Sequence, residues 1–190
     1  MKFQVTKDQV LFLYPYFSLN EREDQKSKEV YYVFKKGWGM DTYFPQIYED
    51  LFGAINDYIR SCGIWQPKVV VTIMPSHKKG EYGDSLVDIT EKVCGEFDFS
   101  NAYNLIQRVI DKTKSTDGGT RNVFSHLHTM RLNHSIGIDT SADIYIVLDD
   151  ITTTGSSLEA ARQVLIRNRV DEDKIVKIAI AKTMHDDDWI

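Results

Sequence analysis

The sequence predicts an α/β fold built on a mainly parallel sheet of five strands with helices on both faces. Short apolar runs alternate along the chain with amphipathic stretches, which is the pattern of a strand-helix-strand fold. The clearest runs are residues 69–74, 144–148 and 175–181, each apolar at nearly every position. A strand that is apolar on both faces is typical of a parallel sheet covered on both sides.

Two weaker runs complete the predicted sheet, residues 105–110 and a segment within 129–138. The first 35 residues mix aromatic side chains with a charged run at 20–29 and have no readable role. Within them, residues 31–34 are aromatic or β-branched, which predicts a strand or an arm packed on the main sheet.

Three segments predict helices between these strands. Residues 43–60 repeat apolar side chains at helical spacing, and Gly63 and Pro67 follow as stop signals. A second helix is expected from Asp84-Ser85 to Phe97, and a third from Ser156-Ser157 to residue 165. Each would place its apolar stripe on the sheet.

Length and charge narrow the class of protein. The chain has 190 residues, of which 42% are hydrophobic and 27% charged, so we expect one domain, with residues 1–42 as an N-terminal arm and 43–185 as the core. The net charge of −5 disfavours a nucleic-acid coat. With no long apolar run and no apolar signal core at the start, a cytoplasmic protein without membrane contact is expected.

The stretch 144–158 carries the clearest chemistry. Its strand runs into two carboxylates, Asp149 and Asp150, and then into a hydroxyl-rich turn before a helix. The turn residues expected to bind a phosphate are Thr153, Thr154, Gly155, Ser156 and Ser157. Such a turn presents free backbone N–H groups and the positive end of a helix dipole, which bind phosphate. Two acids beside an anion site call for ribose hydroxyls or Mg²⁺ as partners. An acidic turn before a capped helix, with no ligand, is the alternative.

This combination resembles the phosphoribosyl pyrophosphate (PRPP) motif of the type I phosphoribosyltransferases, which is a strand, two acids and a Thr-Gly loop. The resemblance implies the type I phosphoribosyltransferase fold with a flexible hood loop. It also implies that Asp149 and Asp150 hold the ribose hydroxyls and that residues 153–157 hold the 5′-phosphate. Mg²⁺ would arrive as a cofactor carried by PRPP near the two acids, with no residue assigned as a direct metal ligand.

Two further segments fit the same resemblance. Ser76, His77, Lys78 and Lys79 follow the strand at 69–74, where the family has its pyrophosphate loop, and adjacent lysines suit a diphosphate. A solvated surface turn is the alternative for them. Residues 107–121 stand where the hood closes over PRPP, and Arg108 and Lys112 are the candidates for stabilising the leaving group. A solvated surface loop is the alternative there.

From about residue 31 to 183 the chain is most similar to the competence-protein-like (ComF-like) branch of this family. The implied function is transfer of the 5-phosphoribosyl group from PRPP to an unidentified base or amine, with release of pyrophosphate. The alternative is a non-catalytic module that senses PRPP or a nucleotide, or serves DNA uptake. Thr153 stands where 6-oxopurine transferases have an aspartate, which disfavours a hypoxanthine or guanine acceptor. Nucleic acid is a less favoured partner, and the family leaves a homodimer open.

Overall fold

The structure is a computed structural model that describes residues 2–17, 24–112 and 122–184. It is an α/β fold, as expected, with a main sheet in the order β1-β2-β8-β7-β3-β4. The strands of this sheet are β1 (Gln4–Val5), β2 (Val10–Tyr16), β8 (Ile175–Thr183), β7 (Ile144–Thr152), β3 (Val69–Ile73) and β4 (Ser100–Asn101). All neighbours pair in parallel except β1 with β2, so the sheet of the described residues is mixed but mostly parallel.

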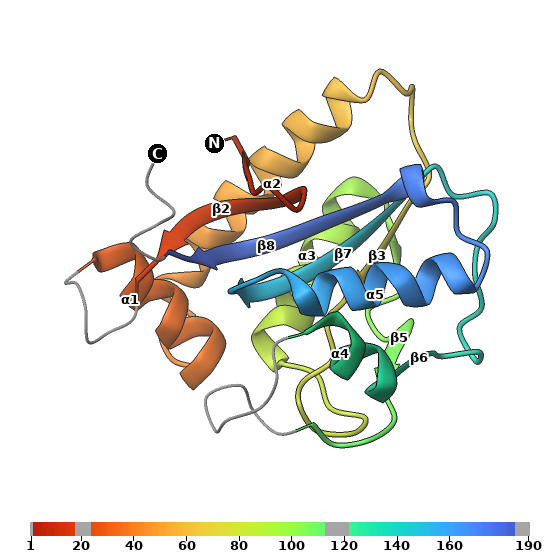
Figure 1. Cartoon of the computed structure of the whole chain (residues 1–190). Coiled ribbons are helices and arrows are strands. Elements are labelled where there is room, and N and C mark those ends of the chain that lie inside the picture. The colour runs from red at the N-terminus through yellow and green to blue at the C-terminus, as the bar shows by residue number, and fades with distance from the viewer. Residues whose placement is uncertain (1, 18–23, 113–121, 185–190) are drawn as a thin grey trace.

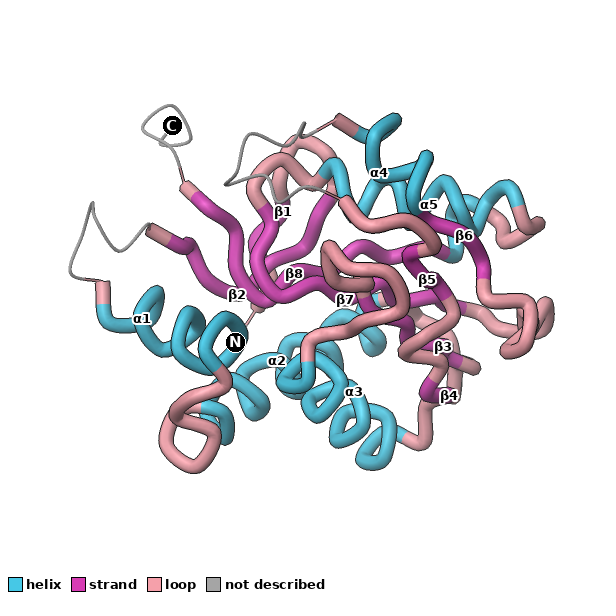
Figure 2. The backbone as a smooth tube through the Cα atoms, turned by 90° about the horizontal axis from the view of Figure 1, so that it is seen from below, coloured by secondary structure: helices cyan, strands magenta, loops and turns pink. Residues whose placement is uncertain are grey.

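Helices cover both faces of the sheet, which confirms that part of the expectation. In Figure 2, α2 (Phe44–Ser61) and α3 (Asp84–Phe97) lie on one side of the strands, and α4 (Val123–Thr129) and α5 (Ser156–Arg167) lie on the other. Two short helices precede them in the chain, α1 (Gln25–Tyr31) and the π-helical turn η1 (Tyr32–Lys36). A 3-10 turn, η3 (Glu172–Lys174), leads into β8.

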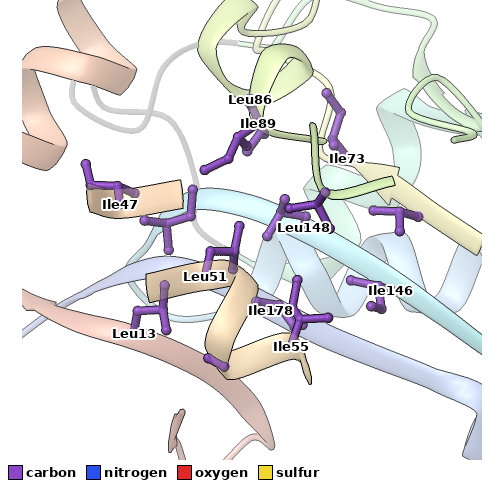
Figure 3. Close-up of a cluster of buried hydrophobic side chains, with 14 of the residues drawn as sticks. Leu13, Ile47, Leu51, Ile55, Ile73, Leu86, Ile89, Ile146, Leu148 and Ile178 are labelled. Carbon is purple, nitrogen blue, oxygen red and sulfur yellow. The ribbon is translucent and has the colours of Figure 1, made fainter. Parts of the chain in front are cut away.

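The core consists of two layers, one on each face, because alternate residues of a strand point to opposite sides. On the α2 and α3 face, Ile146 and Leu148 of β7 meet Leu51 and Ile55 of α2 (Figure 3). On the α5 face, Tyr145 and Val147 of the same strand belong to a second cluster with Leu158 and Leu165 of α5. Burial of β7 on both faces explains its unbroken apolar run.

The N-terminal segment departs from the expectation. Residues 31–34 are helical and form no strand, because Val30 and Val33 are both fully buried and a spacing of three puts two side chains on one face only in a helix. Ser85 of α3 fixes this turn by donating a hydrogen bond to the backbone oxygen of Val33 at 2.7 Å. The strands β1, β2 and β4 were not predicted, so the main sheet of the described residues has six strands where five were expected. The longest of these three is β2, which pairs with β8.

The two weaker strands exist but do not join the main sheet, so their predicted placement is wrong. β5 (Ile106–Arg108) pairs antiparallel with β6 (Met130–Leu132) as a separate ribbon. The ribbon packs its apolar residues, Ile106, Met130 and Leu132, into the cluster on the α5 face. The ribbon places Arg108, the last residue of β5, beside the loop that follows β3.

The helices of the described ranges are too short or too polar to cross a lipid bilayer. The second half of the expected hood, residues 113–121, lies outside the described residues.

Candidate functional site

Asp149 and Asp150 lie at the carboxyl end of β7, beyond the end of the neighbouring strand β3. Ile73, the last residue of β3, is level with Leu148, so β7 continues past β3 by four residues. The carboxyl ends of β2, β8 and β7 point to the side on which α1 lies (Figure 1). Ligands of open α/β sheets bind at this end of the strands.

Asp149 is partly buried and is held by its neighbours in the chain. Its carboxylate accepts hydrogen bonds from the backbone N–H of Asp150 at 2.9 Å and from the hydroxyl of Ser157 at 3.2 Å. Burial, and then the charge of Asp150, raise the pKa of the Asp149 carboxyl to about 7. A carboxylate with this pKa costs free energy to keep ionised, which a cation or a hydroxyl donor would offset.

Asp150 is paired with Lys35, which comes from η1. The ammonium Nζ of Lys35 lies 2.6 Å from Oδ2 of Asp150. Burial lowers the pKa of Lys35, but the charge of Asp150 and its hydrogen bond outweigh burial, so the pKa is raised above its usual value. The acid pair therefore already has one protein cation beside it.

The turn between β7 and α5 is shaped by its own hydroxyl groups. Thr152 accepts a hydrogen bond from the backbone N–H of Gly155 at 3.1 Å, and the hydroxyls of Thr154 and Ser156 lie 2.8 Å apart. Gly155 has φ 73° and precedes the first residue of α5. A helix leaves the N–H groups of its first turn without helical acceptors, and here they face the turn.

The loop after β3 is tied to Arg108 of β5. The guanidinium Nε donates to the backbone oxygen of Ser76 at 2.5 Å, and Nη1 donates to the hydroxyl of Thr129. The backbone oxygen of Arg108 accepts from Gly80 at 3.1 Å, and that of His77 accepts from Lys112 at 2.8 Å. These bonds hold the loop and the end of β5 side by side.

Arg108 is 4% exposed, and within the described residues it forms no ion pair. Burial lowers the pKa of its guanidinium, and the pKa of Lys112 is lowered by burial and then by the charge of Arg108. The charge of Asp149 acts in the opposite direction on Arg108 and raises its pKa, so the two cations and the acid pair act on one another electrostatically at this end of the sheet. An anion beside Arg108 and Lys112 would stabilise their charged forms.

One cavity of about 730 Å³ joins these parts. The acids Asp149 and Asp150 lie on its wall with Ser76, His77, Arg108 and Lys112, and so do Thr153 and Ser157 of the turn. The remaining wall includes the aromatic residues Tyr16, Tyr31 and Phe34, for which the sequence predicted no site role. The cavity thus has a cationic wall, an acid pair, a hydroxyl-rich turn and an aromatic wall.

A second, smaller pocket of about 120 Å³ lies within the turn itself. It is lined by residues 151–157 and by His126 of α4. Thr154, Gly155 and Ser156 line this pocket and not the larger cavity, while Thr153 and Ser157 line both. The volume and the hydroxyl and N–H groups of this loop pocket suit a single phosphate group.

Lys78 and Lys79 lie apart from the other candidate residues. Both are exposed, and neither lines the cavity. Lys78 is 3.7 Å from Glu81, and the backbone N–H of Lys79 donates to Asp111 at 2.7 Å. The structure therefore brings Ser76 and His77 to the cavity through the same loop that directs the two lysines outward.

Lys35, His126 and the aromatic wall are the site residues that sequence reasoning missed. Lys35 is separated from Asp150 by 115 positions, and no local pattern connects them. His126 lies in α4, a seven-residue helix that the sequence did not predict. The signal for the aromatic wall was the run of aromatics in the first 35 residues.

The acid pair suits Mg²⁺ better than a metal held by protein alone. Among the described residues, no group of three or more His, Cys, Asp or Glu side chains could hold a metal ion. Mg²⁺ prefers oxygen ligands and commonly binds one or two carboxylates together with substrate phosphates and water. Asp149 and Asp150 supply two such carboxylates at the cavity wall.

Fold and site together define an α/β protein with a polar cavity at the carboxyl end of a mostly parallel sheet. Comparison of the chain with known proteins finds no matching protein family and no matching curated protein.

Proposed function

We propose that this protein binds PRPP together with Mg²⁺ and transfers its 5-phosphoribosyl group to a small base or amine, releasing pyrophosphate. The type I phosphoribosyltransferase fold of the competence-protein-like branch is part of this proposal. The observation that carries it is a pair of adjoining pockets: an acid pair and a buried arginine line one space of about 730 Å³, and a phosphate-sized loop pocket of about 120 Å³ shares Thr153 and Ser157 with it. PRPP carries a ribose diol, a 5′-phosphate and a pyrophosphate, and these groups match the acid pair, the loop pocket and the arginine respectively.

The chain's residues have distinct tasks in this proposal. The turn at 152–157 binds the 5′-phosphate, and Asp149 and Asp150 accept hydrogen bonds from the ribose hydroxyls. Arg108 and Lys112, with the backbone of Ser76 and His77, face the pyrophosphate. Asp149 and Asp150 would lie close enough to hold the Mg²⁺ that arrives with PRPP, and this ion would neutralise part of the charge on the pyrophosphate. Lysines 78 and 79 remain candidates for pyrophosphate contact only through movement of their loop.

The reaction breaks the bond between C1 of the ribose and the pyrophosphate oxygen and forms a bond from C1 to the acceptor nitrogen. The electron pair of the broken bond leaves with pyrophosphate, and the proton of the acceptor nitrogen passes to the released pyrophosphate or to water. Arg108 stabilises the charge that develops on the leaving group, because a buried guanidinium is screened less than an exposed one. Thr153 has no carboxylate to take the acceptor's proton, so the proposal excludes 6-oxopurines as preferred acceptors.

The acceptor side of the cavity is the aromatic wall. Tyr16, Tyr31 and Phe34 lie there beside Lys35. Aromatic side chains stack on planar rings, so a heterocyclic base is favoured over an aliphatic amine.

The test is calorimetric titration of Mg²⁺-PRPP into Asp149→Asn/Asp150→Asn. We expect PRPP affinity to fall by at least about tenfold, because two hydrogen-bond acceptors lose their charge. The matched control is Asp171→Asn/Asp173→Asn, which removes the same charge next to η3, at the opposite end of β8. Equal affinity of the acid-pair variant and the control would contradict the proposed site.

A second assay separates transfer from binding alone. Pyrophosphate release from Mg²⁺-PRPP is measured with a panel of nucleobases and amines. Release that depends on one acceptor and disappears in Arg108→Met supports the transferase. Binding of PRPP with no release for any acceptor would support the alternative, a module that senses PRPP or a nucleotide without turnover.

A further inference from the structure

His126 closes the loop pocket from outside the loop. Residues 151–157 of the turn line the pocket. Among the described residues, His126 is the one lining residue that comes from outside this turn. His126 also lines the larger cavity. It therefore stands where a ligand enters the loop pocket from the cavity.

The backbone around His126 is fixed by hydrogen bonds. Asn122 caps α4 by accepting from the backbone N–H of Ser125 at 2.8 Å, and Thr129 donates to the backbone oxygen of His126 at 3.0 Å. Thr129 in turn accepts from Arg108. The same arginine that faces the cavity thus supports the helix turn that carries the imidazole.

The imidazole itself is not satisfied by these contacts. Its Nδ1 is buried and has no hydrogen-bond partner among the described residues. A buried polar atom without a partner costs about 1–3 kcal/mol, which a ligand or water that reaches the ring would offset.

We propose that the imidazole of His126 is a ligand of the phosphate group bound in the loop pocket, acting across the pocket from the N–H and hydroxyl groups of residues 152–157. This inference rests on the proposed function for the identity of the ligand, the 5′-phosphate of PRPP. For the phosphate contact itself, it rests only on the pocket and on the unpartnered imidazole. A phosphate oxygen in the pocket would give the ring the hydrogen bond that the free protein lacks.

The surrounding charges agree with an anion at this place. Burial, then the charges of Lys112 and Arg108, lower the pKa of His126 to about 4, so the ring is neutral in the free protein at pH 7. Lys112 follows β5 and Arg108 ends it, while Asp149 and Asp150 of β7 line the same cavity. A neutral imidazole donates a single N–H to an acceptor, which matches one phosphate oxygen.

The test compares two ligands that occupy different parts of the cavity. Ribose 5-phosphate carries the loop-pocket phosphate, whereas Mg²⁺-pyrophosphate carries only the other end of PRPP. We expect His126→Ala to weaken ribose 5-phosphate about tenfold or more and to change pyrophosphate affinity less than twofold. His126→Asn, which keeps one N–H donor, should recover part of the loss.

The matched control is His128→Ala on the same helix, since His128 is exposed and lines a different pocket, between α4 and α5. We expect its affinity for ribose 5-phosphate to equal that of the wild type. Thermal unfolding of each variant shows whether α4 remains folded. An equal loss for ribose 5-phosphate and pyrophosphate in His126→Ala would overturn the inference, because it would show a structural role.

The outcomes also separate this inference from the proposed function. Binding of ribose 5-phosphate that depends on His126, without any binding of PRPP, supports the phosphate ligand and contradicts the transferase. Binding of PRPP that depends on the acid pair but not on His126 supports the transferase and overturns the inference. If the wild type binds neither ribose 5-phosphate nor PRPP, both fail.

Discussion

Lys35 Nζ lies 2.6 Å from Oδ2 of Asp150, and this ion pair joins η1 to the carboxyl end of β7 across 115 positions of the chain. The contact places a cation from the N-terminal segment beside the acid pair of the proposed PRPP site. It also acts on the neighbouring acid, because the charge of Lys35 lowers the pKa of Asp149 against the larger effects of burial and of Asp150.

Replacing this cation should change the titration of Asp149. In Lys35→Met we expect the Asp149 carboxyl to titrate above its value of about 7, because the opposing charge of Lys35 is gone. Carbon-13 NMR of the aspartate carboxyls as a function of pH measures the midpoint. Lys36→Met is the control, since Lys36 faces the ring of Tyr31 at 5.7 Å. An unchanged midpoint in Lys35→Met would show that the ion pair is absent in solution.

Asp149→Asn should stabilise the free protein at neutral and higher pH. The folded pKa of about 7 exceeds the model-peptide value of 3.8, so between these pH values the folded state binds more protons than the unfolded state. Stability contributed by this group therefore falls as pH rises from about 4 to 7 and stays low above that range. We expect a gain of about 1 kcal/mol, or about 2–4 °C in Tm, at pH 8.

The same measurement at pH 4 provides the control for Asp149→Asn. There the wild-type carboxyl is protonated in the folded state, so the variant and the wild type should unfold at nearly the same temperature. An equal gain at both pH values would mean that the effect is unrelated to ionisation of Asp149.

Gly155 should resist any side chain for two separate reasons. Its φ of 73° is strained for other residues, and a Cβ would lie 3.1 Å from Cγ2 of Val10 in β2. We expect Gly155→Ala to cost about 1–3 kcal/mol by urea unfolding. Val10→Ala in the same chain should remove the contact part of that cost, while Gly137→Ala, with φ 79° and open space around it, measures the backbone part alone. Additive costs for the Gly155 and Val10 changes would contradict the contact.

Arg108→Met should destabilise the protein as well as weaken anion binding. The change leaves the backbone oxygen of Ser76 and the hydroxyl of Thr129 without their donor, for which we expect about 1–3 kcal/mol. Arg131→Met is the control, because Arg131 also donates to backbone oxygens but is exposed, where water replaces it. Equal urea midpoints for Arg108→Met and the wild type would mean that Arg108 does not support the loop after β3.

The sequence predicted the parts of the fold that have strong local patterns. The apolar runs 69–74, 144–148 and 175–181 predicted β3, β7 and β8, and helical spacing predicted α2, α3 and α5. The alternation of these runs and helical stretches predicted the mainly parallel sheet. β2 has a similar apolar run from Val10 to Tyr14, but its place beside β8 depends on pairing between opposite ends of the chain. Pairing of that kind leaves no mark in a local window.

The site was likewise predictable only where its residues are close together in the sequence. Asp149, Asp150 and the turn at 153–157 are neighbours in sequence, so one motif predicted that they lie together. Ser76, His77 and Arg108 lie at the same cavity, although the ribbon that carries Arg108 was expected in the main sheet. Lys35 and His126 reach the cavity through contacts between segments that are distant in sequence. Ser85 bonds to the turn that carries Lys35, and Arg108 bonds to Thr129 at the end of the helix that carries His126.

The central claim is that the cavity binds PRPP with Mg²⁺, and calorimetric titration of the wild-type protein with PRPP tests it most directly. Titrations are run with and without Mg²⁺, with ribose 5-phosphate and AMP as comparison ligands. We expect saturable PRPP binding that strengthens with Mg²⁺ and is tighter than the binding of either comparison ligand. AMP binding without PRPP binding, or no binding of any of the three, would contradict it.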